Sequence, residues 1–310
     1  MLKVTRTPDG RAYLHVWREG DEYLRQKGEL LLAEWTNVRF VAIPKPPVEN
    51  VYHVDLSLEP LGFPDETFEA ANAYHVLEHL TPEEGARFVA EVFRVLKPEG
   101  VFRVSVPDLE DICRSYLGQL DAASRDPSAQ NIRRYRWTVM EIFEQMVREK
   151  SGGRMMEALR SGDYDREYVE SKYSDVYRPL LAVEKKAESP PGAESAPRRR
   201  RSRLTPGAVY RSLKRRYRRR ASGDWTDPGV TKERVRWMYD RLSLRSLLEG
   251  AGFVEVQQKD FKHSDIPNWE RYDLDCSNLA ERPIDPSVYV EGRRPASPGA
   301  GPDRPPSMRA

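Results

Sequence analysis

The chain has 310 residues, with 51 Lys and Arg against 49 Asp and Glu, and 39% of its residues are hydrophobic. Its two cysteines, Cys113 and Cys276, are too few and too far apart for a disulfide framework or a multi-cysteine zinc site. No apolar stretch approaches the roughly 18 residues of a membrane helix, and residues 1–20 lack the apolar core of a signal peptide, which favours a cytoplasmic protein.

Charge is unevenly distributed along the chain. Residues 198–220 hold twelve Lys and Arg and no acid, so an acidic body carries one strongly basic segment. The surrounding residues 184–230 are rich in Pro, Ser and Gly and contain almost no apolar run, so we expect a flexible basic insert there. We expect 294–310 to be a disordered tail. The remainder, 1–183 with 231–293, is expected to form one domain.

Through the first two thirds of the chain, short apolar runs alternate with helical patterns, which predicts an α/β fold with a mostly parallel sheet. The first five expected strands are residues 12–17, 38–43, 51–56, 68–74 and 101–106. The clearest helix is expected over residues 82–96, because Thr81 can cap its first turn and Glu84 completes a Thr-x-x-Glu capping box. The Lys-Pro-Glu-Gly sequence at residues 97–100 is expected to end this helix.

Residues 109–183 are predicted to be largely helical, and the chain then returns to the sheet. A helical pattern runs over 109–150 with a break at Asp126, and short helices are expected over 154–183. One apolar stripe, which we expect to lie in a core, consists of Ile142, Phe143, Met146 and Val147. A last helix over 243–249 is expected to close at Gly252 in a left-handed conformation. Strands 253–258 and 287–292 follow.

The segment that leaves the fourth expected strand concentrates ionisable side chains. His75, Glu78 and His79 follow Tyr74 at the carboxyl end of a strand, where open α/β sheets bind ligands. The spacing also matches the H-x-x-E-H pattern of zinc peptidases, which places both histidines on one long helix. Because the next helix begins only at Pro82, we favour a ligand-facing active-site loop and no metal. A third reading is that these groups only satisfy loop backbone.

Several motifs, in order and correctly spaced, carry a resemblance to a known family. They are Asp55-Leu56, LGFPDETFE at 61–69, HVLEHL at 75–80, FRVLKPEG at 93–100 and VSVPDL at 104–109. Together they resemble the class I S-adenosylmethionine-dependent methyltransferases. Residues 237–240, 247–253 and 266–268 are similar to the C-terminal half of a bacterial subgroup associated with surface polysaccharide synthesis. The resemblance covers about 35–183 and 231–293. It implies a Rossmann-like, seven-stranded, mostly parallel sheet with helices on both faces, a reversed last strand and a helical insertion.

The resemblance implies S-adenosyl-L-methionine as cofactor. The binding positions it assigns are Gly20, Asp55, Leu56 and Tyr74. Family members carry a Gly-x-Gly turn after the first strand, where glycine permits positive φ and close approach of the cofactor. Here Trp17 and its neighbours stand in that turn, and only Gly20 survives. The family's second strand ends in an acid that accepts from the ribose hydroxyls, and the matching residue is Arg39, which has no acceptor. The cofactor motif is therefore degenerate.

The activity that the resemblance implies is methyl transfer to an oxygen or nitrogen nucleophile, with a sugar or glycan hydroxyl as the expected acceptor. Either His75 or His79 is the expected base, because imidazole titrates near neutral pH. Glu78 would orient the base, and Asp108 is the next candidate for it. The degenerate cofactor motif favours a second hypothesis, a catalytically inactive scaffold or binding module with the methyltransferase fold.

The basic segment 198–220 contains regularly spaced apolar groups. Val209, Tyr210, Leu213 and Tyr217 recur at spacings of three and four among the cations. This pattern is typical of an amphipathic helix lying on an anionic membrane, so we expect peripheral contact with the inner face of the membrane. A solvated charge run is the alternative. Nucleic-acid binding is disfavoured because the rest of the chain is acidic.

Overall fold

The computed structural model describes residues 3–18, 33–40, 51–150, 152–173, 233–272, 274–275 and 286–297. The chain divides into two compact units, residues 1–110 with 236–310 and residues 111–235. Gly20 and the expected basic insert, including its amphipathic pattern, lie outside the described residues. The single domain expected over 1–183 and 231–293 stays a prediction.

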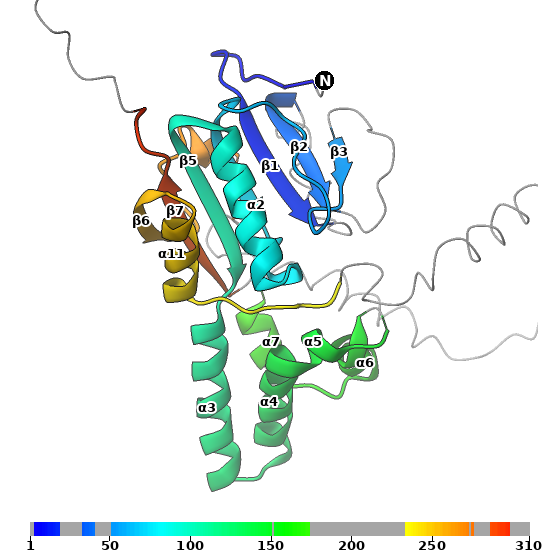
Figure 1. The fold of residues 1–310 in the computed structure, drawn as a ribbon. Helices are drawn as coiled ribbons and strands as arrows, with labels where there is room; N and C mark the ends of the chain where they lie inside the picture. Colours follow the sequence, from blue (N-terminus) through cyan, green and yellow to red (C-terminus); the bar gives the residue numbers. More distant parts are fainter. Residues whose placement is uncertain are drawn as a thin grey trace, which may run out of the picture. The chain divides into compact units, whose positions relative to one another are not determined.

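The first unit contains a seven-stranded sheet in the order β3-β2-β1-β4-β5-β7-β6 (Figure 1). Its strands are β1 (Tyr13–Arg18), β2 (Trp35–Phe40), β3 (Val51–Val54), β4 (Phe68–Tyr74), β5 (Leu96–Pro107), β6 (Val254–Lys259) and β7 (Ser287–Arg293). The first five strands pair in parallel, and β7 runs antiparallel to both β5 and β6. The predicted α/β fold with a reversed last strand is confirmed.

The helix that begins at Pro82 ends at Val95, so residues 97–100 do not continue it, as predicted. The strand β5, however, already begins at Leu96, earlier than the expected strand 101–106. Gly100 and Glu99 continue the sheet by exchanging backbone hydrogen bonds with Arg294, 2.9 Å each, beyond the end of β7. The Arg294 side chain also donates to the carbonyls of Phe93 and Leu96 and forms an ion pair with Glu66 at 2.8 Å. Arg294, expected to start a disordered tail, is therefore anchored in the fold.

One face of the sheet is apolar and is covered by the helices α2 (Pro82–Val95) and α11 (Arg241–Gly250). The predicted capping box begins α2: Thr81 accepts from the Glu84 backbone N–H, and the Glu84 carboxylate accepts from the Thr81 N–H. Gly252 follows α11 with φ +102°, as predicted, and the ring of Phe93 lies 3.2 Å from where a Cβ would stand. Strand side chains in this core include Leu14, Val16, Val38, Phe40, Ala71, Ala73, Phe102 and Val104.

The opposite face of the sheet is lined by aromatic and polar side chains. Arg103, in the middle of β5, is fully buried there, with Nε 2.6 Å from Asp275 and Nη1 2.8 Å from Glu291. Its remaining donors bind the carbonyls of Asp260 and His263, so this arginine ties residues 260–275 to the sheet. A second core forms here from Tyr13, Trp35, Ala70, Val101, Ile266, Trp269, Tyr272 and Leu274.

On the second face the described cover includes the segment after β6, which contains the 3-10 helix η3 (Trp269–Arg271). Helical residue Glu34, just before β2, binds this segment through Arg271 at 3.0 Å and Tyr272 at 2.7 Å.

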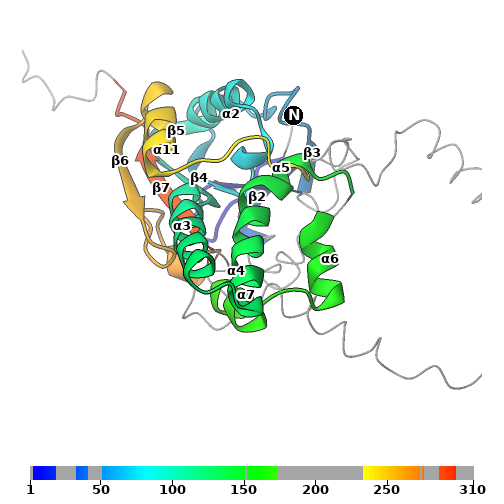
Figure 2. The same cartoon turned by 90° about the horizontal axis from the view of Figure 1, so that it is seen from below.

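The second unit is helical, as predicted (Figure 2). Its elements are α3 (Leu109–Arg125), α4 (Ala129–Val139), η2 (Met140–Glu144), α5 (Gln145–Val147), α6 (Gly153–Ser161) and α7 (Arg166–Lys172). The predicted break near Asp126 is confirmed. Trp137 is fully buried, and its indole N–H donates to the buried Glu141 carboxylate at 3.0 Å. Lys172 and Tyr173 also bind Glu141, which joins the end of α7 to η2.

The apolar stripe expected in the core is wrong for two of its four residues. The side chains of Phe143 and Val147 are 58% and 70% exposed. The reason is that α4 passes into η2, a π-helical turn, which changes the rotational phase of the residues after it. The residues turned inwards are the carboxylates of Glu141 and Glu144 instead.

Candidate active site

The candidate site is built at the carboxyl end of β4. Tyr74 is the last residue of this strand, and His75 directly after it has φ +50°. The His75 backbone N–H donates to the Ser105 carbonyl of β5 at 3.0 Å, which holds this turn against the neighbouring strand. A left-handed conformation at a residue other than glycine costs of the order of 1 kcal/mol and is concentrated at functional sites. The backbone therefore directs His75 away from the strand path.

Three side chains form a hydrogen-bonded chain at this edge, and a fourth, His79, lies close to it. His75 Nε2 lies 3.0 Å from Ser287 Oγ, and His75 Nδ1 lies 3.0 Å from Glu78 Oε1. His79 Nε2 lies 3.7 Å from the same Glu78 oxygen. Glu78 and His79 belong to the 3-10 helix η1 (Leu77–His79), and Ser287 begins β7. We call Ser287, His75 and Glu78 the relay.

Glu78 is the charged centre of this chain. Its side chain is 2% exposed, and burial alone raises the pKa of such a carboxyl. The charges of His75 and His79, with the hydrogen bond from His75, outweigh burial and hold the Glu78 pKa below its ordinary value of 4.5. Glu78 is therefore ionised at neutral pH and favours a proton on His75 Nδ1. That leaves Nε2 as the acceptor towards Ser287, because neutral imidazole has one donor and one acceptor nitrogen.

Residues 236–239 follow the expected basic insert and contact the same turn through Glu78. The Glu78 carbonyl accepts from the backbone N–H groups of Arg236 at 2.6 Å and Trp237 at 3.2 Å. Tyr239 is buried, and burial first, then the charges of Glu78 and Glu83, raise its pKa to about 12. Its hydroxyl therefore stays protonated beside the carboxylate.

Asp108, the other candidate base, lies one residue beyond β5. Its carboxylate accepts from the Glu110 N–H at 2.9 Å, and its backbone N–H donates to the Pro286 carbonyl at 3.1 Å. Pro286 directly precedes Ser287, so Asp108 lies at the same edge of the sheet as the relay. Its carboxylate oxygen, however, already supports the first turn of α3.

The expected cofactor residues that the structure describes lie at two separate places along this edge, after β3 and at the end of β4. Asp55 follows β3, is 4% exposed, and accepts from the Ser57 backbone N–H at 3.1 Å and from the Ser57 hydroxyl at 2.5 Å. Leu56 belongs to the apolar core, which also contains Phe63. The Tyr74 ring lies 4.5 Å from the His75 ring. The structure thus brings Tyr74 to the relay and places Asp55 three strands away.

The resemblance points neither to Ser287, which belongs to the site, nor to Arg103 in the middle of β5. Ser287 comes from β7 and reaches His75 only because β7 pairs with β5. Arg103 was visible as a charged residue inside the buried run of β5, which is a signal for a buried ion pair. Asp275 and Glu291, its partners, are both buried with it.

In the part of the chain that the structure describes, no group of three or more His, Cys, Asp and Glu side chains is arranged to hold a metal ion. Glu78 and His79 lie in a short 3-10 helix and His75 precedes it, whereas the zinc-peptidase pattern requires both histidines on one long helix.

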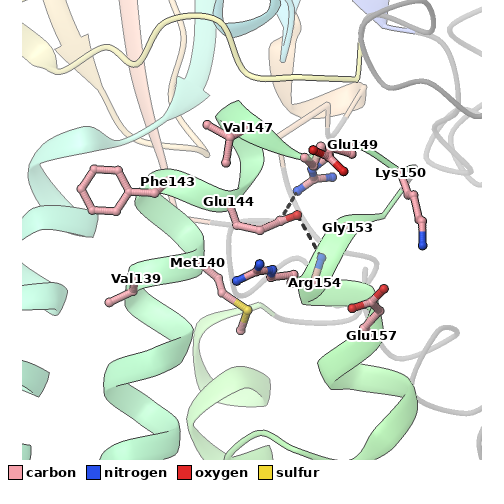
Figure 3. Close-up of a pocket in the computed structure, with 11 residues that line it drawn as sticks. Val139, Met140, Phe143, Glu144, Val147, Glu149, Lys150, Gly153, Arg154 and Glu157 are labelled. Carbon is pink, nitrogen blue, oxygen red and sulfur yellow. Dashed lines mark hydrogen bonds and ion pairs between the residues drawn. The ribbon is translucent and has the colours of Figure 1, made fainter.

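The second unit contains a cavity of about 530 Å³ between α4, α5 and α6 (Figure 3). It is lined by Val139, Met140, Phe143, Glu144, Val147, Arg148, Glu149, Lys150, Gly153, Arg154 and Glu157. Glu144 binds the Arg148 guanidinium at 3.0 Å and the Arg154 backbone N–H at 2.9 Å, so these lining groups satisfy one another (Figure 3). The remaining charges are of both signs. This lining selects no chemical class of ligand.

Comparison with known proteins bears on the first unit. Residues 36–104, from β2 into β5, match the family described as a methyltransferase domain. This segment is methyltransferase-like. It contains Asp55, the His75 turn and Arg103, and it ends before Asp108 and Ser287.

One curated relative and two solved structures illustrate the similarity. A protein of Mycolicibacterium smegmatis (strain ATCC 700084 / mc(2)155), described as a probable S-adenosylmethionine-dependent methyltransferase, is 42% identical over 62 residues, or 20% of this chain. The chain spans 23% of the length of that relative. An S-adenosylmethionine-dependent methyltransferase from Methanosarcina mazei is 13% identical over 95% of both chains, with a TM-score of 0.37. The Burkholderia thailandensis 1,6-didemethyltoxoflavin-N1-methyltransferase is 21% identical over 30% of this chain and 45% of its own, with a TM-score of 0.23.

The structure describes no helix that is both long and apolar enough to cross a membrane.

Proposed function

We propose that the protein is an S-adenosylmethionine-dependent methyltransferase that acts on a hydroxyl group. The match of residues 36–104 to the methyltransferase domain and the seven-stranded sheet support the reaction class. The observation that carries the choice of acceptor is the relay, in which a buried carboxylate, an imidazole and a hydroxyl are joined by two contacts of 3.0 Å.

In this proposal His75 is the general base. Glu78 accepts from Nδ1–H and fixes the tautomer, so Nε2 is the nitrogen that takes a proton. The imidazolium that forms is stabilised by the buried negative charge of Glu78. A hydroxyl needs such a base at neutral pH because it is a poor nucleophile until its proton is removed, and general-base catalysis contributes about 10²–10⁴ in rate.

Ser287 indicates where the acceptor binds. Its Oγ occupies the hydrogen-bonding position that an acceptor hydroxyl would need in front of Nε2. An acceptor can therefore displace Ser287 from this contact or bind next to it. A sugar or glycan hydroxyl is the acceptor that we propose, on the basis of the resemblance to methyltransferases associated with surface polysaccharide.

The fit of the cofactor to the described residues differs between the two ends of the site. S-adenosylmethionine, when bound, supplies an electrophilic methyl group. At the β3 end, the buried carboxylate of Asp55 could hold the adenine side of the cofactor. At the end of β2, Arg39 does not fit: it offers no acceptor to the ribose hydroxyls. Its positive charge is also unfavourable near a ligand with a sulfonium and an ammonium group.

Contact with anionic membranes through residues 198–220 is part of the proposal. Its basis is the sequence alone, namely twelve cations around apolar residues at helical spacing. Such contact would suit an enzyme whose glycan acceptor is linked to a lipid.

Titration of the purified protein with S-adenosylhomocysteine by calorimetry tests the cofactor, and transfer of a labelled methyl group to sugar acceptors tests the reaction. Micromolar binding and labelled product are expected. Absence of binding at millimolar ligand would reject the enzyme and favour the inactive scaffold.

A further inference from the structure

Four side chains form a row across the carboxyl ends of neighbouring strands. Tyr74 of β4 pairs in register with Trp17 of β1, Trp17 with Arg39 of β2, and Arg39 with His53 of β3. Residues in register on parallel strands point to the same face of the sheet. We call these four residues the edge row. It spans the switch point between β1 and β4, where open α/β sheets bind nucleotides and other ligands.

The aromatic half of the row is filled. Trp17 is 3% exposed and stacks on His15, with ring centroids 5.3 Å apart, and Tyr74 is 5% exposed beside His75. A buried tryptophan therefore stands near the end of β1, where the family pattern has a glycine that lets a cofactor approach. Any ligand at this edge is therefore displaced towards the ends of β2 and β3.

Arg39, in the other half of the row, is not neutralised. Arg39 Nε is buried without a hydrogen-bond partner, and Arg39 forms no ion pair with the residues that the structure describes. Asp55, the carboxylate that follows β3, is bound to Ser57 through two hydrogen bonds. A buried guanidinium N–H without an acceptor is costly, because this donor has lost water without gaining a partner.

We propose that the end of β2 and β3 binds the phosphate group of a nucleoside phosphate, with Arg39 as the anion-binding residue. Guanidinium binds phosphate through two parallel N–H···O bonds, and this contact would satisfy the buried Nε. His53, next to Arg39 in register, supplies a second nitrogen side chain at the same end. The inference goes beyond methyl transfer: it assigns a ligand class to a place where Arg39 does not fit S-adenosylmethionine.

The test is calorimetric titration of the full chain with ADP and with adenosine at low and high salt. ADP is expected to bind at least 10-fold more tightly than adenosine, and its affinity should fall as salt rises because the contact is ionic. Arg39→Gln should weaken ADP binding 10- to 100-fold, and Arg39→Lys should weaken it less because the charge is kept without the paired geometry.

Arg245→Gln is the matched control, because Arg245 is 59% exposed on α11 and pairs with Glu249. It should leave ADP affinity unchanged. Circular dichroism and the melting temperature show whether each variant is folded. Equal affinity for ADP and adenosine, or an unchanged affinity in folded Arg39→Gln, would overturn the inference. Titration with S-adenosylhomocysteine in parallel separates this result from the proposed methyltransferase, which fails only if that ligand does not bind.

Discussion

His75 Nδ1 lies 3.0 Å from Oε1 of Glu78, three residues further along the chain, and the left-handed backbone of His75 makes this contact possible. Glu78 is 2% exposed while His75 is 16% exposed, so the carboxylate holds the ring from inside and the imidazole is the more accessible of the two groups. The buried Glu78 carboxylate is therefore the orienting group, and the His75 imidazole is the group that exchanges protons.

Replacing His75 is expected to remove the base without removing the cofactor site. In His75→Asn, which tolerates the left-handed backbone, turnover should fall by about 10²–10⁴. Affinity for S-adenosylhomocysteine should change little, and turnover and calorimetry measure the two separately. His79→Asn is the internal control and should have the smaller effect, because His79 is 3.7 Å from Glu78. If neither variant loses turnover, the base lies elsewhere, with Asp108 next to be tested.

Glu78→Gln is expected to change the pH dependence of stability. The folded-state pKa of Glu78 lies below its ordinary value of 4.5, so the unfolded chain takes up its proton first as pH falls. The stabilisation from Glu78 is therefore present above about pH 4.5 and is lost as pH falls through the lower folded-state pKa. Urea unfolding between pH 3 and 7 should show wild type losing this increment while Glu78→Gln does not. Parallel curves for both proteins would contradict the pairing.

Arg103→Met is expected to destabilise the first unit strongly. The substitution leaves Asp275 and Glu291 buried without their cation, and removal of one partner from a buried pair costs about 3–5 kcal/mol. Urea unfolding measures this loss, with Arg245→Met on the exposed face of α11 as control. Adding Asp275→Asn to Arg103→Met should restore part of the stability. A loss below about 1 kcal/mol would show that the cluster is not buried as described.

Trp17 and Arg39 can be changed towards the family pattern. Arg39→Asp should raise affinity for S-adenosylhomocysteine, because an acceptor replaces a donor at the ribose position, and Trp17→Gly with Arg39→Asp should raise it further. The same variants should lose ADP. Calorimetry on folded protein measures both ligands. Because Trp17 is buried, the single Arg39→Asp variant keeps the test valid if the double variant unfolds. Unchanged or lower affinity in a folded variant would count against our placement of the cofactor.

The parts of the molecule that could be predicted from sequence are those set by local chemistry. The capping box of Thr81 and Glu84 and the left-handed Gly252 depend on neighbouring residues only. Ser287 could not be predicted as a partner of His75, because their contact joins residues 212 apart through strand order. The exposure of Phe143 was missed because the π-helical turn breaks the periodicity on which the expectation was based.

The basic segment gives the last prediction, which concerns vesicle binding. Val209, Tyr210, Leu213 and Tyr217 would share one face of a helix of roughly fourteen residues, with cations around it. Each Lys or Arg near an anionic surface contributes about 1 kcal/mol, so several can hold the protein there reversibly.

Co-sedimentation with anionic and neutral vesicles at low and high salt measures this binding. The full chain should pellet with anionic vesicles at low salt and be released at high salt, and a version lacking 198–220 should stay in solution. Leu213→Asp should weaken binding by more than one lost apolar contact, because it also places a negative charge against the anionic surface. Equal pelleting with both kinds of vesicle, or no effect of the deletion, would exclude the membrane as the partner of this segment.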